Sequence, residues 1–444
     1  MSDSNGATNP TGGAIDRRGL TQPALDCDLM SQVLDRRNLQ RAWRQVRRNG
    51  GAPGVDGMTI EDFPDFIGTH WDEIRQALEK GTYRPQPVRR RVIPKPNGGE
   101  RLLGIPSVID RVIQQAIAQV LTPIFDPEFS ASSFGFRPKR SAHGAIKQVQ
   151  RFIRKGLRFA VDLDLAKFFD RVDHDVLMNR VGRRVTDDQL LRLIGRYLRA
   201  GVWTDDKLLA TTQGVPQGGP LSPLLANIIL DDFDKELERR GHRFARYADD
   251  VIIVVGSKRS GERVMASVTR WLESVLRLEV NTQKSHVVPT NKATFLGFTF
   301  RGTKISWSDK TLHRFQARIK ELTGRNWGVS MKRRMKELAL YLNGWMAYFG
   351  LSGYYRPIPE LERWIRRRVR MCYWNMWRKR YTRIQRLLAR GVSRKWAILT
   401  GLSSKGPWHM SRNYAIHVAL SDAYLARRGL VSIRDIWIQS AQLR

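Results

Sequence analysis

The sequence is poor in cysteine, in acidic residues and in long apolar runs. Cys27 and Cys372 are the only cysteines among 444 residues, too few for a disulfide framework or a cysteine-based zinc site. Because this usage suits a reducing compartment, we expect a cytoplasmic protein. The sequence contains no run of about 18 uncharged apolar residues and no lipidation signal, so we expect no membrane partner.

The shortage of acidic residues leaves a large excess of positive charge. Lys and Arg total 77 against 42 Asp and Glu, which gives a formal net charge of +35. A polyanionic partner is therefore expected, and nucleic acid fits better than a membrane surface. Charge alone leaves one alternative open, a ribosome-associated protein that is merely basic.

The first hundred residues predict a polar tail, two helices and a hairpin. Residues 1–25 are polar and rich in Gly and Asn, and we expect a disordered tail there. Helical spacing runs from Leu34 to Arg48 and again from Ile60 to Lys80. Residues 84–106 alternate as two extended segments around Asn97-Gly98-Gly99, a sequence typical of a basic β-hairpin.

The middle of the chain mixes helical and strand patterns. Apolar residues from Ile109 recur at the spacing of a buried helix, which Pro123 is expected to end. Strand patterns follow, and elements of both kinds alternate up to about residue 300. This mixture predicts an α+β fold for that part of the chain.

Composition changes after residue 300. Residues 301–400 hold 25 Lys and Arg against 5 Asp and Glu, a net charge of +20, and seven of the 13 tryptophans. An apolar helical stripe is formed by Leu361, Ile365, Val369, Cys372 and Met376, and Arg363, Arg366, Arg367 and Arg370 lie largely off it. We predict a separate helical domain with a basic face; a solvated charged helix is the alternative.

Two strand patterns carry carboxylates that an ordinary core would not contain. Period-two alternation in 159–165 places Asp162 and Asp164 on one face of an otherwise apolar strand. Two acids on one such face are costly unless a cation meets them. Residues 244–255 predict a buried hairpin whose turn exposes Asp249 and Asp250.

These carboxylates suit nucleotidyl transfer. In-line phosphoryl transfer uses two Mg²⁺ ions about 4 Å apart, and such hard cations prefer oxygen ligands. Asp164 at a strand end and Asp249-Asp250 at a hairpin tip would provide them. Taken alone, the Asp-Asp pair has an equally good interpretation as an ordinary turn.

The motif YADD, residues 247–250, resembles the polymerase signature of reverse transcriptases. Further segments resemble motifs of that family in the expected order along the chain: RVIPKPNGGERLLGIPSVIDRVIQQAI (91–117), SFGFRPKRSAH (133–143), VDLDLAKFFD (161–170), QGVPQGGPLSPLLANIIL (213–230), NTQKSH with Lys284 (281–286) and FLGF (295–298). The loop GAPGVDGMT (51–59) and the segment NGWMAYFG (343–350) are similar to those of group II intron reverse transcriptases with maturase activity. The resemblance covers roughly residues 30–440.

The resemblance implies a right-hand polymerase followed by an α-helical domain. Residues 26–300 would form the fingers and palm, 301–400 the thumb and maturase domain, and 401–444 a C-terminal basic region. Many relatives end in an H-N-H endonuclease with paired cysteines, whereas residues 401–444 contain no cysteine. DNA cleavage by this chain is therefore not expected.

The resemblance also assigns roles to individual residues. Asp164, Asp249 and Asp250 would be catalytic and would bind two Mg²⁺ ions, helped by the backbone carbonyl of Leu165. Asp162 faces the same way but is interpreted as a structural acid.

Five further residues would bind the substrate. Lys95 and Arg101 would contact the incoming triphosphate, Gln217 the nucleotide and template, and Lys284 the pyrophosphate. Phe169 would crowd the sugar 2′ position and so select deoxynucleotides. Core packing is the alternative for Phe169, and plain surface exposure for Lys95 and Arg101.

The function implied is an RNA-directed DNA polymerase that adds dNTPs to a target DNA primer on an RNA template. It would also bind its intron RNA to assist splicing and mobility. Two alternatives stay open: a reverse transcriptase recruited to a host role such as phage defence, and an RNA-binding splicing cofactor with an idle polymerase. The sequence carries no signal for an oligomeric state.

Overall fold

A computed structural model describes residues 28–94, 100–204 and 207–442. The chain divides into two compact units, one of Met1–Glu128 and Phe169–Ile229, the other of Phe129–Phe168 and Leu230–Arg444. Helices α6 (Phe168–Arg171) and α9 (Ser222–Arg239) carry the chain across the division. The expected tail, the hairpin turn at 97–99 and Lys95 lie outside the described residues.

The first unit contains a four-stranded sheet in the order β2-β1-β4-β5. Its strands are β1 (Val88–Pro94), β2 (Glu100–Ile105), β4 (Val202–Thr204) and β5 (Lys207–Leu209). The predicted hairpin is confirmed, because β1 and β2 pair antiparallel from Arg89 opposite Ile105 to Pro94 opposite Glu100. β1 also pairs in parallel with β4.

The helices of this unit differ from the sequence expectation at two points. They are α1 (Leu29–Leu34), α2 (Arg36–Asn49), α3 (Phe63–Glu79), α4 (Val108–Phe125), α7 (His174–Gly182) and α8 (Asp188–Leu198), with a 3-10 turn at Asp126–Glu128. The chain breaks between α1 and α2 because the Asp35 carboxylate caps α2, accepting from the backbone N–H of Arg37 and Asn38. Helix α4 continues through Pro123 to Phe125, since a proline in the last turn removes a single backbone hydrogen bond.

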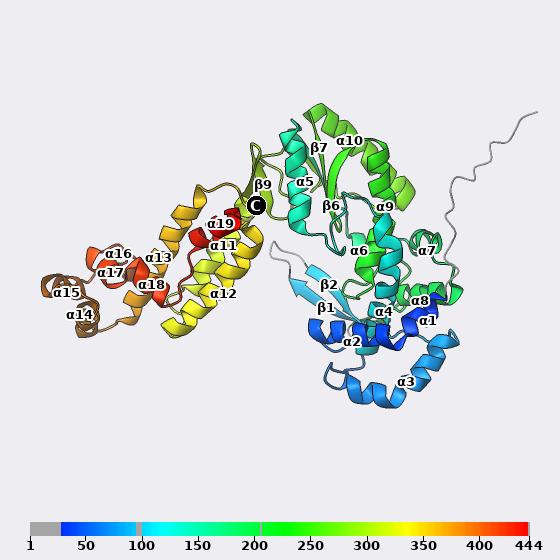
Figure 1. The fold of residues 1–444 in the computed structure, drawn as a ribbon, viewed down its shortest axis with the longest axis horizontal. Coiled ribbons are helices and arrows are strands. Elements are labelled where there is room, and N and C mark those ends of the chain that lie inside the picture. The colour runs from blue at the N-terminus through cyan, green and yellow to red at the C-terminus, as the bar shows by residue number, and fades with distance from the viewer. Residues whose placement is uncertain (1–27, 95–99, 205–206, 443–444) are drawn as a thin grey trace, which may run out of the picture. The chain divides into compact units, whose positions relative to one another are not determined.

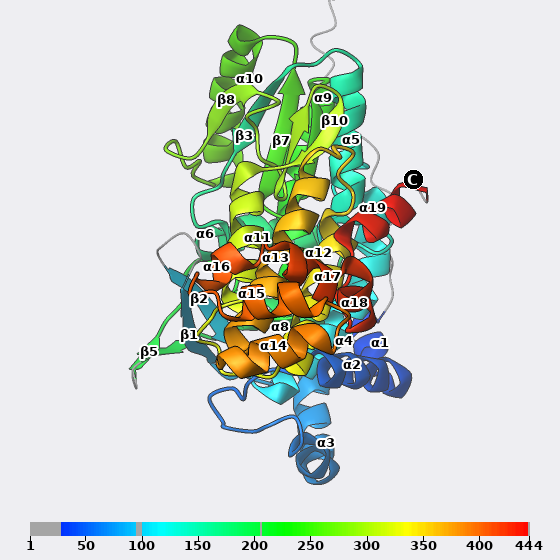
Figure 2. The ribbon, with the colours of Figure 1, turned by 90° about the vertical axis from the view of Figure 1, so that its left-hand side faces the viewer.

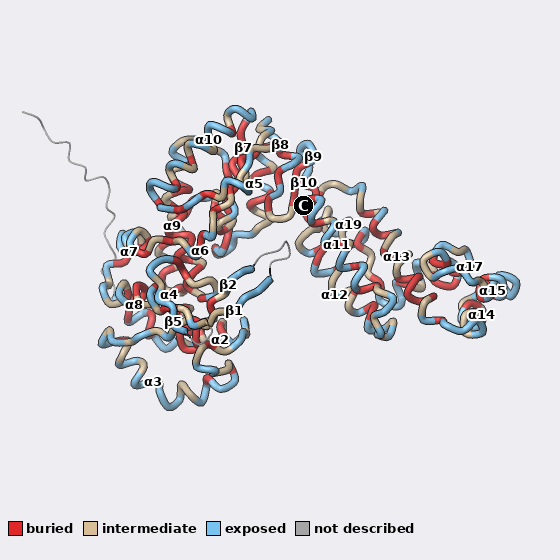
Figure 3. The backbone as a smooth tube through the Cα atoms, turned by 180° about the vertical axis from the view of Figure 1, so that it is seen from behind, coloured by how far each residue is buried: buried red, intermediate tan, exposed pale blue. Residues whose placement is uncertain are grey.

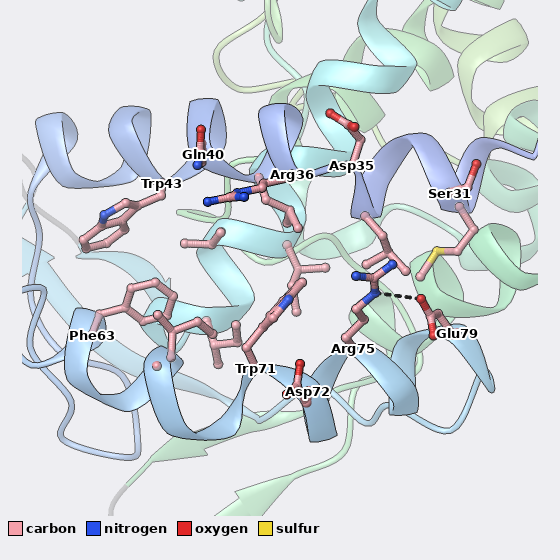
Figure 4. Close-up of a pocket in the computed structure, with 18 of the residues that line it drawn as sticks. Ser31, Asp35, Arg36, Gln40, Trp43, Phe63, Trp71, Asp72, Arg75 and Glu79 are labelled. Carbon is pink, nitrogen blue, oxygen red and sulfur yellow. Dashed lines mark hydrogen bonds and ion pairs between the residues drawn. The ribbon is translucent and has the colours of Figure 1, made fainter.

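A hollow of about 1040 Å³ lies between α2 and α3 (Figure 4). Trp43 packs on Phe63 with ring centroids 4.6 Å apart, and Trp71 extends from α3 into the space. The charged residues around it are Asp28, Asp35, Asp72, Glu79, Arg36 and Arg75. Four acids against two arginines make this hollow net negative, in contrast to the chain as a whole.

The second unit is built on an antiparallel sheet in the order β6-β7-β3-β8 (Figure 2). The strands are β3 (Phe159–Leu163), β6 (Arg243–Tyr247), β7 (Asp250–Val255) and β8 (His286–Pro289). Helix α5 (Ala142–Arg154) packs against β6 and β7, and α10 (Lys258–Trp271) packs against β3, β7 and β8 (Figure 1). Val251–Val255 are all buried, so both faces of the sheet are covered.

The remainder of this unit is mainly helical. A π-helical turn, Leu272–Leu276, is followed by a hairpin of β9 (Phe298–Arg301) and β10 (Lys304–Trp307). The helices after it are α11 (Asp309–Leu322), α12 (Met331–Phe349), α13 (Pro357–Met376), α14 (Arg380–Leu388), α15 (Arg394–Gly401), α16 (Pro407–Met410), α17 (Tyr414–Ala419), α18 (Asp422–Arg427) and α19 (Ile433–Gln442). One hydrophobic core joins the sheet to these helices, from Ala160 in β3 to Ile433 in α19, and Figure 3 shows the buried positions in red. None of the described helices is long and apolar enough to cross a membrane.

Helix α13 carries the apolar stripe largely as predicted. Leu361, Ile365, Val369 and Cys372 are buried, whereas Met376 is 47% exposed. The prediction was wrong for Arg370, which was placed on the basic face and is only 5% exposed. Its guanidinium donates to the carbonyl of Leu420 at 2.9 Å and to Asp422 at 2.7 Å, so its charge is used inside the protein.

The core of the helical part can be tested on α12, where two leucines differ in burial. Leu342 is fully buried and Leu340 is 71% exposed. We expect Leu342→Ala to lower the free energy of unfolding by about 2–5 kcal/mol, because it leaves a cavity. The matched change Leu340→Ala should stay within about 0.5 kcal/mol. Urea unfolding followed by tryptophan fluorescence measures both, and equal effects would contradict the packing described.

Candidate active site

The second unit brings three of the predicted carboxylates to one end of its sheet. Asp164 follows the last residue of β3, and Asp250 is the first residue of β7. The strands are antiparallel and Leu163 pairs with Val251, so the next step of the register sets Asp164 opposite Asp250. Asp249 precedes Asp250 in the β6–β7 turn. Residues far apart in sequence therefore meet at one edge.

The backbone at Asp164 is fixed by the loop before β8. The Asp164 N–H donates to the hydroxyl of Ser285 at 3.0 Å, and its carbonyl accepts from the N–H of Asn281 at 2.8 Å. Leu165 forms an isolated bridge with Val280. Both backbone groups of Asp164 are thus satisfied within the protein, and its carboxylate remains available.

Lys284 and His286 approach the carboxylates at this edge, from the loop before β8 and from β8 itself. Lys284 Nζ lies 3.7 Å from Asp164 Oδ2, with 68% of the lysine side chain exposed. His286 Nε2 lies 3.8 Å from Asp162 Oδ2 across the β3–β8 ladder. The structure therefore sets Lys284, predicted to contact pyrophosphate, beside the first carboxylate.

Desolvation, together with repulsion between neighbouring carboxylates, raises the pKa of two acids in this cluster. Desolvation, followed by repulsion from Asp249, Asp162 and Asp164, raises the pKa of Asp250 to about 6. Desolvation, and then Asp164, raises the pKa of Asp162 to about 6 although His286 opposes the shift. Asp250 is nevertheless exposed. Among the described residues, four carboxylates, Asp162, Asp164, Asp249 and Asp250, thus lie near a single lysine, Lys284. This excess of negative charge suits a hard cation that prefers oxygen ligands.

The carboxylates do not form a closed ligand set by themselves. Across the part of the chain that the structure describes, no three His, Cys, Asp or Glu side chains converge closely enough to hold a metal ion. Divalent ions bound mainly through one or two protein carboxylates usually complete their shell with water and substrate phosphates. An open set is what such a site would need.

A buried ion pair holds the turn that carries Asp249 and Asp250. Arg246 and Asp234 are both 0% exposed at their side chains. Arg246 Nε donates to Asp234 Oδ1 at 2.8 Å and Nη2 to Oδ2 at 2.6 Å. The remaining nitrogen, Nη1, donates to the carbonyl of Ala248 at 2.9 Å. Since Ala248 has a left-handed φ of 57°, this donor stabilises a turn that alanine adopts reluctantly.

The segment Ser132–Gly135 supports the same turn. The Arg246 N–H donates to the Ser132 carbonyl and the Phe134 N–H to the Arg246 carbonyl, each at 2.9 Å. Gly135 lies so close to the turn that a Cβ there would overlap the backbone nitrogen of Ala248. Only glycine permits this approach.

The predicted substrate residues that the structure describes in the first unit lie around its sheet and one loop. Gln217 is half-buried, and its carbonyl accepts from the N–H of Gly104 in β2 at 2.8 Å. Phe169 is half-buried in α6, with its carbonyl bonded to the N–H of Val215 at 2.6 Å. Arg101 is exposed on β2. These backbone hydrogen bonds fix the positions of Gln217 and Phe169 in the fold.

Sequence reasoning missed Arg246 and Asp234. A signal was present, because Arg246 is a charge inside a strand whose neighbours Phe244 and Ala245 are apolar. A buried charge requires a partner, the same argument that identified Asp162 and Asp164 as unusual. The partner, twelve residues away in α9, could not be identified from spacing.

Comparison with known proteins gives two family matches. Residues 93–300 match the family described as reverse transcriptase (RNA-dependent DNA polymerase). Residues 312–389 match the maturase-specific domain of group II introns. Both matches lie within the described part of the chain apart from the two short gaps.

Individual relatives agree with these matches. The chain is 33% identical over 337 residues to protein YkfC of Escherichia coli (strain K12), covering 66% of this chain and 87% of that protein. It is 31% identical over 326 residues to the group II intron-encoded protein LtrA of Lactococcus lactis subsp. cremoris, covering 59% of this chain and 54% of LtrA. The match thus spans about half of LtrA. Among solved structures, a partial Cas6-RT-Cas1--Cas2 complex is 26% identical, with a TM-score of 0.37 and coverage of 56% of this chain and 43% of that chain.

The buried pair beneath the turn can be tested by removing one partner. We expect Asp234→Asn to lower the free energy of unfolding by about 3–5 kcal/mol, because Arg246 would remain charged and buried. Glu236→Gln is the matched control on the same helix, since Glu236 pairs with Arg239 and Arg240 at the surface, and should cost at most about 1 kcal/mol. Chemical unfolding measures both variants.

A double change separates stability from positioning. Replacing both partners, Asp234→Leu with Arg246→Met, should recover most of the lost stability because no charge stays buried. The Ala248 carbonyl would still lack its hydrogen-bond donor. The backbone amides of the turn should therefore exchange their hydrogens faster in the double variant than in the parent protein. Full protection of the turn in the double variant would show that Arg246 has no positioning role.

Proposed function

Because this chain belongs to the reverse transcriptase family and carries a maturase-specific domain of group II introns, we propose that it extends a target DNA primer on an RNA template with dNTPs. We propose further that it binds its intron RNA and assists splicing and mobility. The observation that carries the proposal is the meeting of Asp164, Asp249 and Asp250 at one end of the β6-β7-β3-β8 sheet.

Asp164, Asp249, Asp250 and the carbonyl of Leu165 would hold two Mg²⁺ ions. When bound, these ions would stabilise charge on the attacking and leaving oxygens of phosphoryl transfer. The fixed backbone of Asp164 and the clamped turn at Ala248 hold the carboxylates in place before substrate arrives, which lowers the cost of reaching the reactive geometry.

Side chains with donors would orient the triphosphate. Lys284 lies 3.7 Å from Asp164, so its ammonium can pair with the carboxylate in the absence of substrate and with the pyrophosphate group in its presence. Lys95 and Arg101 would contact the triphosphate, and Arg101 offers a planar fork for it. Gln217 would contact the nucleotide.

Phe169 would act as the gate that excludes a 2′-hydroxyl. Its neighbour Phe168 is 2% exposed and belongs to the core, whereas Phe169 is half-buried. A gate must be partly accessible, so this difference favours Phe169 for the role. An aromatic ring at this position would exclude ribonucleotides in favour of deoxynucleotides, so the product would be DNA.

Residues 301–400 would form the thumb and RNA-binding domain, with 401–444 packed against it. The maturase-specific match at 312–389 supports that use. Exposed arginines and aromatic rings are the groups that meet phosphates and unpaired bases. A polymerase recruited to a host role would share all these features, and a ribozyme sequence in the flanking DNA would separate the two.

The carboxylate assignment predicts loss of synthesis in a single variant. Asp249→Ala should abolish Mg²⁺-dependent extension of a DNA primer on an RNA template, since a cation ligand is removed. Equilibrium binding of the primer–template should remain largely intact. Glu262→Ala is the matched control, because Glu262 is an exposed acid on α10, and should leave extension unchanged. Full extension by Asp249→Ala would refute the assignment.

The gate assignment predicts a change in sugar selection. Phe169→Ala should raise incorporation of ribonucleotides relative to deoxynucleotides, because the ring that crowds the 2′ position is gone. Single-nucleotide extension with each substrate gives the ratio of kcat/KM values. Tyr381→Ala, at an aromatic residue that is 72% exposed, should leave the ratio unchanged. The same ratio in both variants would remove Phe169 from this role.

A further inference from the structure

A cavity of about 470 Å³ among the last helices of the second unit concentrates positive charge. Its charged lining consists of Arg363, Arg366, Arg367, Arg370, Arg412 and Asp422. Five arginines against Asp422, and against Glu362, which pairs with Arg366 at 2.7 Å, leave a net charge of +3 with His417 neutral. The hollow between α2 and α3 is net negative, so the excess charge of the chain is not distributed evenly over its cavities.

Two carboxylates fix two of these guanidinium groups: Asp422 binds both, and Glu362 accepts from Arg366 Nη2 at 2.7 Å. Asp422 accepts from Arg366 Nη1 through Oδ2 at 2.6 Å and from Arg370 Nη2 through Oδ1 at 2.7 Å. Arg370 also donates to the carbonyl of Leu420 and is only 5% exposed. Two arginines from α13 are thereby held on one wall of the cavity before any ligand binds.

A third guanidinium is held by stacking. Arg367 lies over the ring of Trp408, with its central carbon 3.6 Å from the ring centroid, and donates to the Trp408 carbonyl at 3.1 Å. Burial, and then repulsion from Arg412, lowers the pKa of Arg367. The wall thus contains two arginines, Arg367 and Arg412, that repel each other.

The two remaining arginines are available to a ligand. Arg363 and Arg412 are both exposed, and within residues 28–94, 100–204 and 207–442 the structure gives neither guanidinium a hydrogen bond or an ion pair. Trp364 also lines the cavity and is half-buried, with Arg368 5.4 Å from its ring centroid. Free donors and a partly exposed indole therefore border the same space.

We propose that this cavity binds a backbone phosphate of a nucleic-acid strand, with a neighbouring base against Trp364. Planar guanidinium groups match phosphate oxygens in geometry as well as charge, and an indole offers a surface for any base. An acidic peptide would satisfy the charge but would leave the indole without a flat partner. The inference rests on the proposed binding of nucleic acid and is independent of the polymerase chemistry.

The test is equilibrium binding of a short single-stranded RNA, and of DNA of the same sequence, to the full chain without Mg²⁺ or dNTPs. Arg412→Ala should weaken binding about ten-fold, as expected for a lost charged hydrogen bond, and should reduce the salt slope by about 0.7. Arg263→Ala removes the same charge from an exposed position on α10, outside residues 301–400, and should change binding much less. If Arg412→Ala weakens binding of only one of the two oligonucleotides, that nucleic acid is the source of the phosphate.

Asp422→Asn distinguishes a built pocket from diffuse attraction. The change removes a negative charge, so general electrostatics predicts tighter binding, whereas loss of the anchor for Arg366 and Arg370 predicts weaker binding. Equal effects of Arg412→Ala and Arg263→Ala on binding would overturn the proposal. So would tighter binding by Asp422→Asn in a variant that keeps the melting temperature of the parent protein. So would competition by a polyglutamate peptide as strong as by the oligonucleotides. No polymerisation is measured, so failure here leaves the Asp249 test untouched.

Discussion

The carboxylate end of the palm-like sheet depends on the buried contact between Arg246 and Asp234. A buried ion pair adds little stability compared with apolar side chains of the same volume, so its importance here is geometrical. Two guanidinium nitrogens of Arg246 donate to Asp234, and the third donates to the carbonyl of Ala248. Arg246 therefore connects the turn that presents Asp249 and Asp250 to helix α9. Because exposed acids repel one another, their positions must be held by other residues, here Arg246 and Asp234, which do not contact the substrate.

Much of this arrangement could be predicted from the sequence because its strands are apolar segments that end in acids. Alternation located β3, apolar runs on either side of the turn located the β6–β7 hairpin, and both patterns placed Asp164, Asp249 and Asp250 at the strand ends. It could not reveal that Asp234 pairs with Arg246, since a helix and a strand meet through the fold and not through spacing. The helices after Gly401 were also not predicted, because α16 to α18 are each six residues or fewer and carry almost no periodicity.

Arginine in the helical part serves packing as often as it offers charge. Arg334 is 3% exposed, and its guanidinium donates to the carbonyls of Leu322 and Trp327. Arg383 and Arg390 lie over the rings of Trp374 and Trp377. The number of arginines in the sequence therefore overstates the positive charge available to a polyanion. For the same reason, Arg370 was predicted to lie on a binding face although it is buried. The arginines that matter for recognition are those left over after the fold has used the others.

The continuous core from β3 to α19 limits how this enzyme could be shortened. Met410, Ile416, Leu420, Leu425 and Ile433 are buried in the same cluster as the residues of α12 and α13. A version cut before these helices would expose their apolar counterparts and tend to aggregate. A compact laboratory polymerase based on this chain would therefore need a redesigned surface on α13, and could not be obtained by deletion alone.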